Sequence, residues 1–179
     1  MKKIFACLFL INVAIACKNG SEKSRHNPAN ETEANIYRSA DSMMAAFKRK
    51  DWITFAKYNH PAMMKMMGGQ QSFVSFIAEQ MKQIPDTAIK KLETGKILQV
   101  VKTDKDGQCV IEQNMEMHLE GTKILSTTYL IGESLDGGKN WTFFDASTKA
   151  MAPKDIKPDI SPELKIPKKK QEMLKGMSH

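Results

Sequence analysis

The sequence lacks the short motifs that mark the best-known nucleotide-binding and metal-dependent enzymes. It contains no P-loop, no dinucleotide-binding glycine fingerprint, no H-E-x-x-H and no paired-cysteine motif. Among its 179 residues, 41% are hydrophobic and 26% are charged, which excludes both a polytopic membrane protein and a wholly disordered chain. The composition predicts one globular domain with tails, and no motif in it declares a function.

The sequence also has no apolar run long enough to cross a bilayer. Lys2 and Lys3 precede a short apolar stretch, Ile4 to Ala16. As a helix this stretch rises only about 20 Å, which is too short for a hydrocarbon core of roughly 30 Å. Residues 1–16 are therefore interpreted as a signal peptide.

The end of this stretch fits two peptidases. Ala14-Ile15-Ala16 matches the A-x-A pattern of ordinary signal peptidase, and with Cys17 it resembles the bacterial lipobox. We expect cleavage after Ala16 and attachment of acyl chains, palmitate among them, to Cys17. The alternative is a secreted protein with one unmodified thiol at that position.

Lipidation predicts a location in the bacterial cell envelope. Two or more acyl chains anchor a protein firmly to a membrane, and the polar residues 18–32 suit a linker between lipid and domain. Lys18 is not the acidic residue that retains lipoproteins in the inner membrane of enteric bacteria, which favours the outer membrane, facing the periplasm. With Cys7 removed and Cys17 modified, Cys109 has no disulfide partner, and the core must hold the domain.

Helical spacing of apolar residues follows the linker. Asn30 or Thr32 is placed to cap a first helix, and Asp51 a second short one. Pro61 suits the first turn of a third helix, and a fourth is predicted over about 71–84. One face of the first helix carries Ile36, Ala40, Met43 and Phe47.

From residue 89 the apolar period changes from 3.6 to 2. About four antiparallel strands are predicted, with turns near 104–107 and 120–122. Helices followed by a meander indicate an α+β architecture in which N-terminal helices pack on one face of a curved antiparallel sheet. We assign 33–150 to this domain and 151–179 to a basic Pro/Lys-rich tail, expected to wrap the surface or to stay mobile.

This order of elements is similar to the NTF2-like (SnoaL-like, cystatin-like cone) superfamily over roughly residues 33–167. The resemblance lies in the segment Tyr58–Gln70 and in two pieces near the end of the domain, Tyr129-Leu-Ile-Gly132 and Asp136-Gly-Gly-Lys-Asn-Trp-Thr-Phe143. These pieces resemble exported bacterial members of that shape. The resemblance implies a cone whose concave sheet face and helices enclose a pocket, and it implies no particular activity.

Two residues are candidates for orienting a ligand in such a pocket. Gln113 is the polar exception on an apolar strand face, and Tyr129 lies on the next alternating strand. The alternative is a buried amide and phenol whose hydrogen bonds are satisfied by the backbone.

The turn after the third strand matches a structural motif. Ser134-Leu-Asp136-Gly-Gly-Lys-Asn-Trp141 fits the Asp-box pattern S-x-D-x-G-x-x-W. It predicts a tight hairpin with Trp141 packed beneath it. One such box cannot make a propeller, which needs repeated blades.

Three further patterns each allow a functional interpretation and a simpler structural one. Met63, Met64, Met66 and Met67 near His60 supply thioethers suited to Cu(I), or else fill a core. His118, between Glu116 and Glu120, suits a metal or acid–base site, or else a solvated strand face. The lysine-rich tail attracts anionic lipid, or else is simply solvated.

Taken together, these patterns predict a non-catalytic envelope lipoprotein that binds a small apolar ligand or a protein partner. No cofactor, resident metal or nucleic acid is expected. An enzyme of isomerase or hydrolase type, a homodimer paired through the sheet, and Cu(I) binding by Met63–Met67 remain the alternatives.

Overall fold

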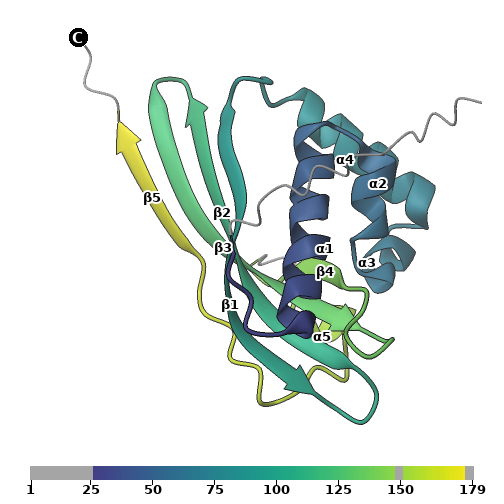
Figure 1. The fold of residues 1–179 in the computed structure, drawn as a ribbon. Helices are drawn as coiled ribbons and strands as arrows, with labels where there is room; N and C mark the ends of the chain where they lie inside the picture. The colour runs from purple at the N-terminus through teal and green to yellow at the C-terminus, as the bar shows by residue number, and fades with distance from the viewer. Residues whose placement is uncertain (1–25, 148–150, 176–179) are drawn as a thin grey trace, which may run out of the picture.

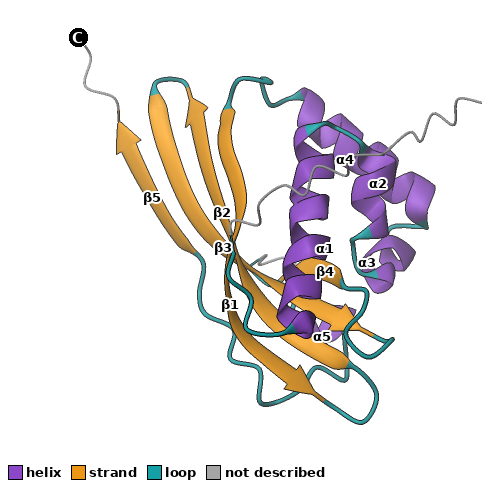
Figure 2. Cartoon of the chain, viewed as in Figure 1, coloured by secondary structure: helices purple, strands orange, loops and turns teal. Residues whose placement is uncertain are grey.

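The computed structural model describes residues 26–147 and 151–175, so Cys17 and the predicted signal peptide lie outside the described residues. Four helices come first, followed by four strands, a short helix and a last strand (Figures 1 and 2). The helices are α1 (Glu31–Lys48), α2 (Trp52–Lys57), α3 (Pro61–Met66), α4 (Gln70–Lys82) and α5 (Pro153–Ile156). The strands are β1 (Ile89–Lys102), β2 (Gly107–Leu119), β3 (Thr122–Ser134), β4 (Thr142–Asp145) and β5 (Lys170–Lys175). Within the described ranges, no helix is both long and apolar enough to span a membrane.

The predicted caps set the helix starts. Asn30 Oδ1 accepts the Glu33 N–H at 2.9 Å, and Asp51 Oδ1 accepts the Thr54 N–H at 3.0 Å. Pro61 occupies the first turn of α3, where a missing N–H costs nothing. These positions confirm the sequence predictions, and α4 ends two residues before the predicted 84.

The strands form an antiparallel sheet in the order β1-β2-β3-β4, with β5 also paired to β3. The turn at Glu120 and Gly121, both with positive φ, pairs Leu119 with Thr122. One edge of β3 is shared, because its first half pairs with β5 and its last residues pair with β4. The predicted α+β class with an antiparallel sheet is confirmed, and the sheet has five strands and is not closed.

The two faces of the sheet carry separate apolar clusters. We call the face toward α1 the inner face and the opposite one the outer face (Figure 1). The inner cluster joins the apolar face of α1 to sheet residues such as Ile111 and Leu130. The outer cluster comprises Val101, Val110, Tyr129, Ile131, Phe144, Ile156 and Leu164.

The segment after residue 150 covers the outer face. Two glutamine side chains hold its backbone. Gln108 donates to the Asp159 carbonyl at 3.2 Å and accepts from the Ser161 N–H at 2.8 Å. Gln99 donates to the Glu163 carbonyl at 2.8 Å and accepts from the Lys165 N–H at 3.0 Å. Each glutamine amide thereby supplies the hydrogen-bond donor and acceptor that a neighbouring strand would otherwise offer to this extended backbone.

Candidate functional site

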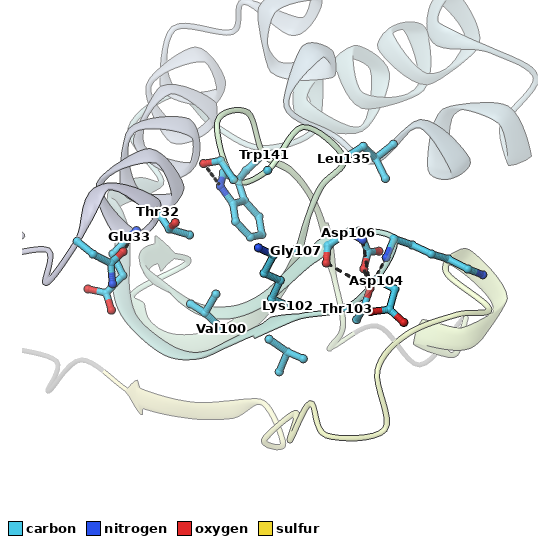
Figure 3. Close-up of a pocket in the computed structure, with 15 residues that line it drawn as sticks. Thr32, Glu33, Val100, Lys102, Thr103, Asp104, Asp106, Gly107, Leu135 and Trp141 are labelled. Atoms are coloured by element: carbon cyan, nitrogen blue, oxygen red, sulfur yellow. Dashed lines mark hydrogen bonds between the residues drawn. The ribbon is translucent and has the colours of Figure 1, made fainter.

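A cavity of about 450 Å³ lies where three segments meet at one end of the sheet. Figure 3 shows Thr32 and Glu33 of α1, Val100 and Lys102 of β1, and Trp141 of the β3–β4 turn around this space. The volume falls in the range of small-molecule sites. We call it the Trp141 cavity.

The Asp-box turn fixes the indole at this position. The Asp136 carboxylate accepts hydrogen bonds from the backbone N–H groups of Asn140 at 3.0 Å and Lys139 at 3.1 Å, and from the Ser134 hydroxyl at 2.8 Å. These bonds, with the Asn140 backbone N–H the foremost, hold the pKa of Asp136 well below its usual 3.8. Trp141 Nε1 donates to the Gly138 carbonyl at 3.1 Å, so its polar edge is satisfied and the ring is left for packing.

Helix α1 is docked on the same turn. Asn35, a buried residue of α1, donates from Nδ2 to the Gly138 carbonyl at 2.8 Å. Gly138 has φ +89°, and a Cβ there would lie 3.3 Å from Thr32 Oγ1. Glycine therefore permits both the turn and the close approach of the helix.

Gly107 forms part of the cavity floor. A Cβ at this position would lie 3.2 Å from Trp141 Cη2, so a larger residue would press on the ring. The first residue of β2 thus lets the indole approach the strand backbone closely.

The lining combines exposed apolar side chains with charged margins. Val100 is 40% exposed and Leu135 is 73% exposed, although both are apolar. Lys102 and Lys105 face the cavity together with Glu33 and Asp104. The lining residues include no serine, cysteine or histidine, so they form no nucleophile–base pair of the Ser–His or Cys–His type. The cavity therefore offers apolar contact area with charged groups at its margins.

A second polar centre lies on the outer face, around the ammonium of Lys157, which is only 3% exposed. Its Nζ contacts Asp106 Oδ2 at 2.6 Å, Asp159 Oδ1 at 2.9 Å, and Glu133 Oε1. His60 Nδ1 accepts the Ala62 N–H, so the ring proton lies on Nε2, which donates to Glu133 at 2.8 Å. We call these residues the Lys157 cluster.

Hydrogen bonding sets the charges in this cluster. Burial alone would raise the pKa of Asp106, but hydrogen bonds from Lys157, Thr103 and Gln108 lower it from 3.8 to about 2. The His60 bond and Lys157 together lower the pKa of Glu133. Burial would lower the pKa of Lys157, and its carboxylate partners raise it instead.

The spacing of these carboxylates would suit a metal ion. Asp106, Glu133 and Asp159 offer oxygens within 4.8 Å of one another. The Lys157 ammonium contacts all three, so it supplies the positive charge that the carboxylates require. The cluster is built as a structural tie between the sheet, His60 and the C-terminal segment.

The two predicted ligand-orienting residues lie on opposite faces of the sheet. Gln113 pairs with Thr128, and Tyr129 pairs with Glu112. Tyr129 is buried in the outer cluster, whereas the alternation of β2 places Gln113 on the inner face with Ile111 and Met115. The structure does not bring them together, so they cannot line one pocket. Ligand contact by either one stays a prediction, as does lipidation of Cys17, which lies outside the described residues.

The other sequence candidates are dispersed. Met63 packs against the outer cluster, while Met66 is exposed. His118 is exposed and its Nε2 lies 2.8 Å from Glu116, which also contacts Lys123 at 3.0 Å. This surface trio matches the solvated-face reading of that strand.

Sequence reasoning identified Trp141 only as a hairpin residue and did not single out Lys157. The Asp-box pattern was a usable signal for Trp141, since it placed a large ring beside a tight turn. No local pattern signals Lys157, because its partners come from residues 106, 133 and 159.

The chain matches no protein-family model, no curated protein and no solved structure with which it was compared.

Proposed function

We propose that this protein is a lipid-anchored component of the bacterial envelope whose NTF2-like cone domain binds a small apolar ligand in the Trp141 cavity. The observation that carries the proposal is the exposure of Val100 and Leu135 beside the Trp141 ring, around about 450 Å³. Exposed apolar side chains around a concave, preformed space are typical of ligand sites. Helices preceding an antiparallel sheet, and packed on one of its faces, support the cone architecture.

The proposed lipid anchor depends on Cys17, so replacing this residue should remove the attachment to the membrane. Changing Cys17→Ser removes the thiol that carries the acyl chains but keeps the A-x-A site. Expressed in a bacterium, the variant should move from the membrane fraction to the soluble periplasmic fraction and lose labelling by a palmitate analogue. Cys109→Ser is the matched control and should keep the label. A Cys17→Ser variant that stays labelled would contradict the proposal.

Ligand binding in the Trp141 cavity is tested on the exported Cys17→Ser chain. Native mass spectrometry asks first whether a small molecule co-purifies. Anilinonaphthalene sulfonate, an anionic dye with large apolar rings, then serves as the probe, read by energy transfer from Trp141 in a Trp52→Phe background. Leu135→Ala should weaken probe binding about tenfold, because it removes apolar area that the bound probe would bury.

Ile53→Ala is the matched control, since Ile53 is an equally apolar, exposed residue of α2 that does not line the cavity. It should leave the affinity for the probe unchanged. Equal effects of Leu135→Ala and Ile53→Ala would show that the probe binds exposed apolar surface in general, and would overturn the assignment of the cavity.

A further inference from the structure

A second and larger cavity, of about 670 Å³, lies beside helix α1 and is separate in its lining from the Trp141 cavity. We call it the flank cavity. One side is the flank of α1 that carries Tyr37, Arg38, Asp41, Met44 and Lys48. Leu92, Glu93 and Thr94 of β1 form another side, and His26 and Pro28 line it from the segment before α1.

Thr94 presents a buried hydroxyl with no hydrogen-bond partner. The residue is 7% exposed, and its Oγ1 bonds to nothing among the described residues. Leaving a buried hydroxyl unpaired destabilises a fold, and valine has nearly the same shape without that cost. A ligand that reaches this hydroxyl would supply the partner that the described residues do not.

Local strand geometry keeps this hydroxyl from the neighbouring strand. Thr94 pairs with Gln113, and the β1–β2 register shifts directly after it, between Thr94 and Ile97. In that irregular stretch the Tyr37 hydroxyl of α1, rather than a strand, accepts the Ile97 N–H at 3.3 Å. The side chain of Thr94 thus lies where the ladder is interrupted and α1 borders the cavity.

The lining as a whole points to a neutral, hydrogen-bonding ligand. Arg38 and Lys48 are balanced by Asp41 and Glu93, so no net charge favours an anion or a cation. His26 stacks on Tyr37 with ring centroids 3.8 Å apart and an angle of 5° between the planes. Met44 and Leu92 add apolar area. Acidic and basic side chains beside an aromatic stack can both donate to and accept from a polyhydroxylated ring, while the aromatic and apolar side chains pack on its C–H faces.

We infer that the flank cavity binds a polyhydroxylated ligand of the saccharide class, with the Thr94 hydroxyl hydrogen-bonded to a ligand hydroxyl. This site is independent of the proposed apolar site, because the two cavities share no lining residue. It assigns a carbohydrate-binding role to the face of α1 that the Trp141 cavity does not use.

The experiment is calorimetric titration of the exported Cys17→Ser chain with maltose and with N,N′-diacetylchitobiose at millimolar concentration, beside urea unfolding without sugar. Thr94→Val should weaken sugar binding about tenfold or more, since the ligand loses a hydrogen bond in a buried setting. The same variant should unfold at an equal or higher urea concentration than the parent. If Thr94→Val binds sugar more weakly but is no less stable, Thr94 contacts the ligand; a merely structural contact would lower the stability instead.

Two variants keep the result interpretable. Thr94→Ser retains the hydroxyl and should retain binding even if the lost methyl group lowers stability. Ser126→Ala removes the other buried hydroxyl that lacks a partner in the described residues, and Ser126 does not line this cavity. It should leave sugar affinity unchanged. Equal sugar affinity of Thr94→Val and the parent, or no heat from either disaccharide, would overturn the inference.

Discussion

Replacing Lys157 with methionine is expected to lower the free energy of unfolding by about 3–5 kcal/mol. Methionine retains most of the packing of the buried stem but removes the ammonium that faces Asp106, Glu133 and Asp159. Asp106 and Glu133 would then be buried without a cation, and removing one partner of a buried ion network costs more than the network contributes as a whole. Urea denaturation at neutral pH measures the loss.

The pH dependence identifies the cause. In the parent, the pKa of Asp106 is lowered from 3.8 to about 2, so its stabilising contribution is present above pH 3.8 and is lost as the pH falls toward 2. Lys157→Met lacks the part of that contribution that Lys157 supplies, while Thr103 and Gln108 still bind Asp106. The difference in unfolding free energy between parent and variant should therefore become smaller over the same pH window. Lys154→Met, at an exposed lysine of α5, should change stability by no more than about 0.5 kcal/mol. If the difference in unfolding free energy between parent and Lys157→Met did not change with pH, the loss would come from packing and not from charge.

Trp141→Ala is the second change with a large expected effect, again about 3–5 kcal/mol of unfolding free energy. The indole is buried in the inner cluster and packs against Gly107, so its removal leaves a void beneath the Asp-box turn. The variant also loses the donor to the Gly138 carbonyl, which then keeps only Asn35 as a side-chain donor. Chemical denaturation followed by far-ultraviolet circular dichroism measures the change.

Leu135→Ala, in the same turn, is the stability control. Its side chain is mostly exposed, so the expected loss lies within about 0.5 kcal/mol. Trp141→Phe should fall between the two variants, because it keeps an aromatic ring but not the Nε1 donor. If Trp141→Ala cost no more than Leu135→Ala, the ring would not be part of the core, and the Trp141 cavity would lose its fixed wall.

The helices were predictable because their signals are local. Asn30, Asp51 and Pro61 each act within a few residues of their own position, and the spacing from Ile36 to Phe47 matches a single helix face. The change of period at residue 89 likewise predicted the meander. The residues that set these elements need no information from distant parts of the chain.

We expected Gln113 and Tyr129 to line one pocket, but the structure places them on opposite faces of the sheet. The sequence already contained the reason. Once the turn at Glu120 and Gly121 pairs Leu119 with Thr122, the antiparallel register pairs Gln113 with Thr128 and Tyr129 with Glu112. Cross-strand partners share a face, and neighbours along a strand do not. Tyr129 therefore had to lie on the face opposite Gln113.

The C-terminal segment was beyond local prediction. Lysine and proline dominate its composition, and both are usually exposed in folded proteins. In the structure its apolar residues Ile156 and Leu164 complete the outer cluster, and Lys170–Lys175 forms β5. Lys157 is buried because three carboxylates converge on it from separate segments, a coincidence of tertiary structure that composition cannot reveal.

The Lys157 cluster also constrains the order in which the chain can fold. Its members come from the loop before α3, from the residue before β2, from the end of β3 and from the segment after α5. The longest of these contacts, between His60 and Glu133, closes a loop of 73 residues. A chain emerging N-terminus first, from a ribosome or a translocation channel, would present β2 and β3 long before Lys157 arrives. Until then Asp106, Glu133 and the outer apolar face lack the partners that the segment around Lys157 supplies, so this part of the domain is completed only after that segment has emerged.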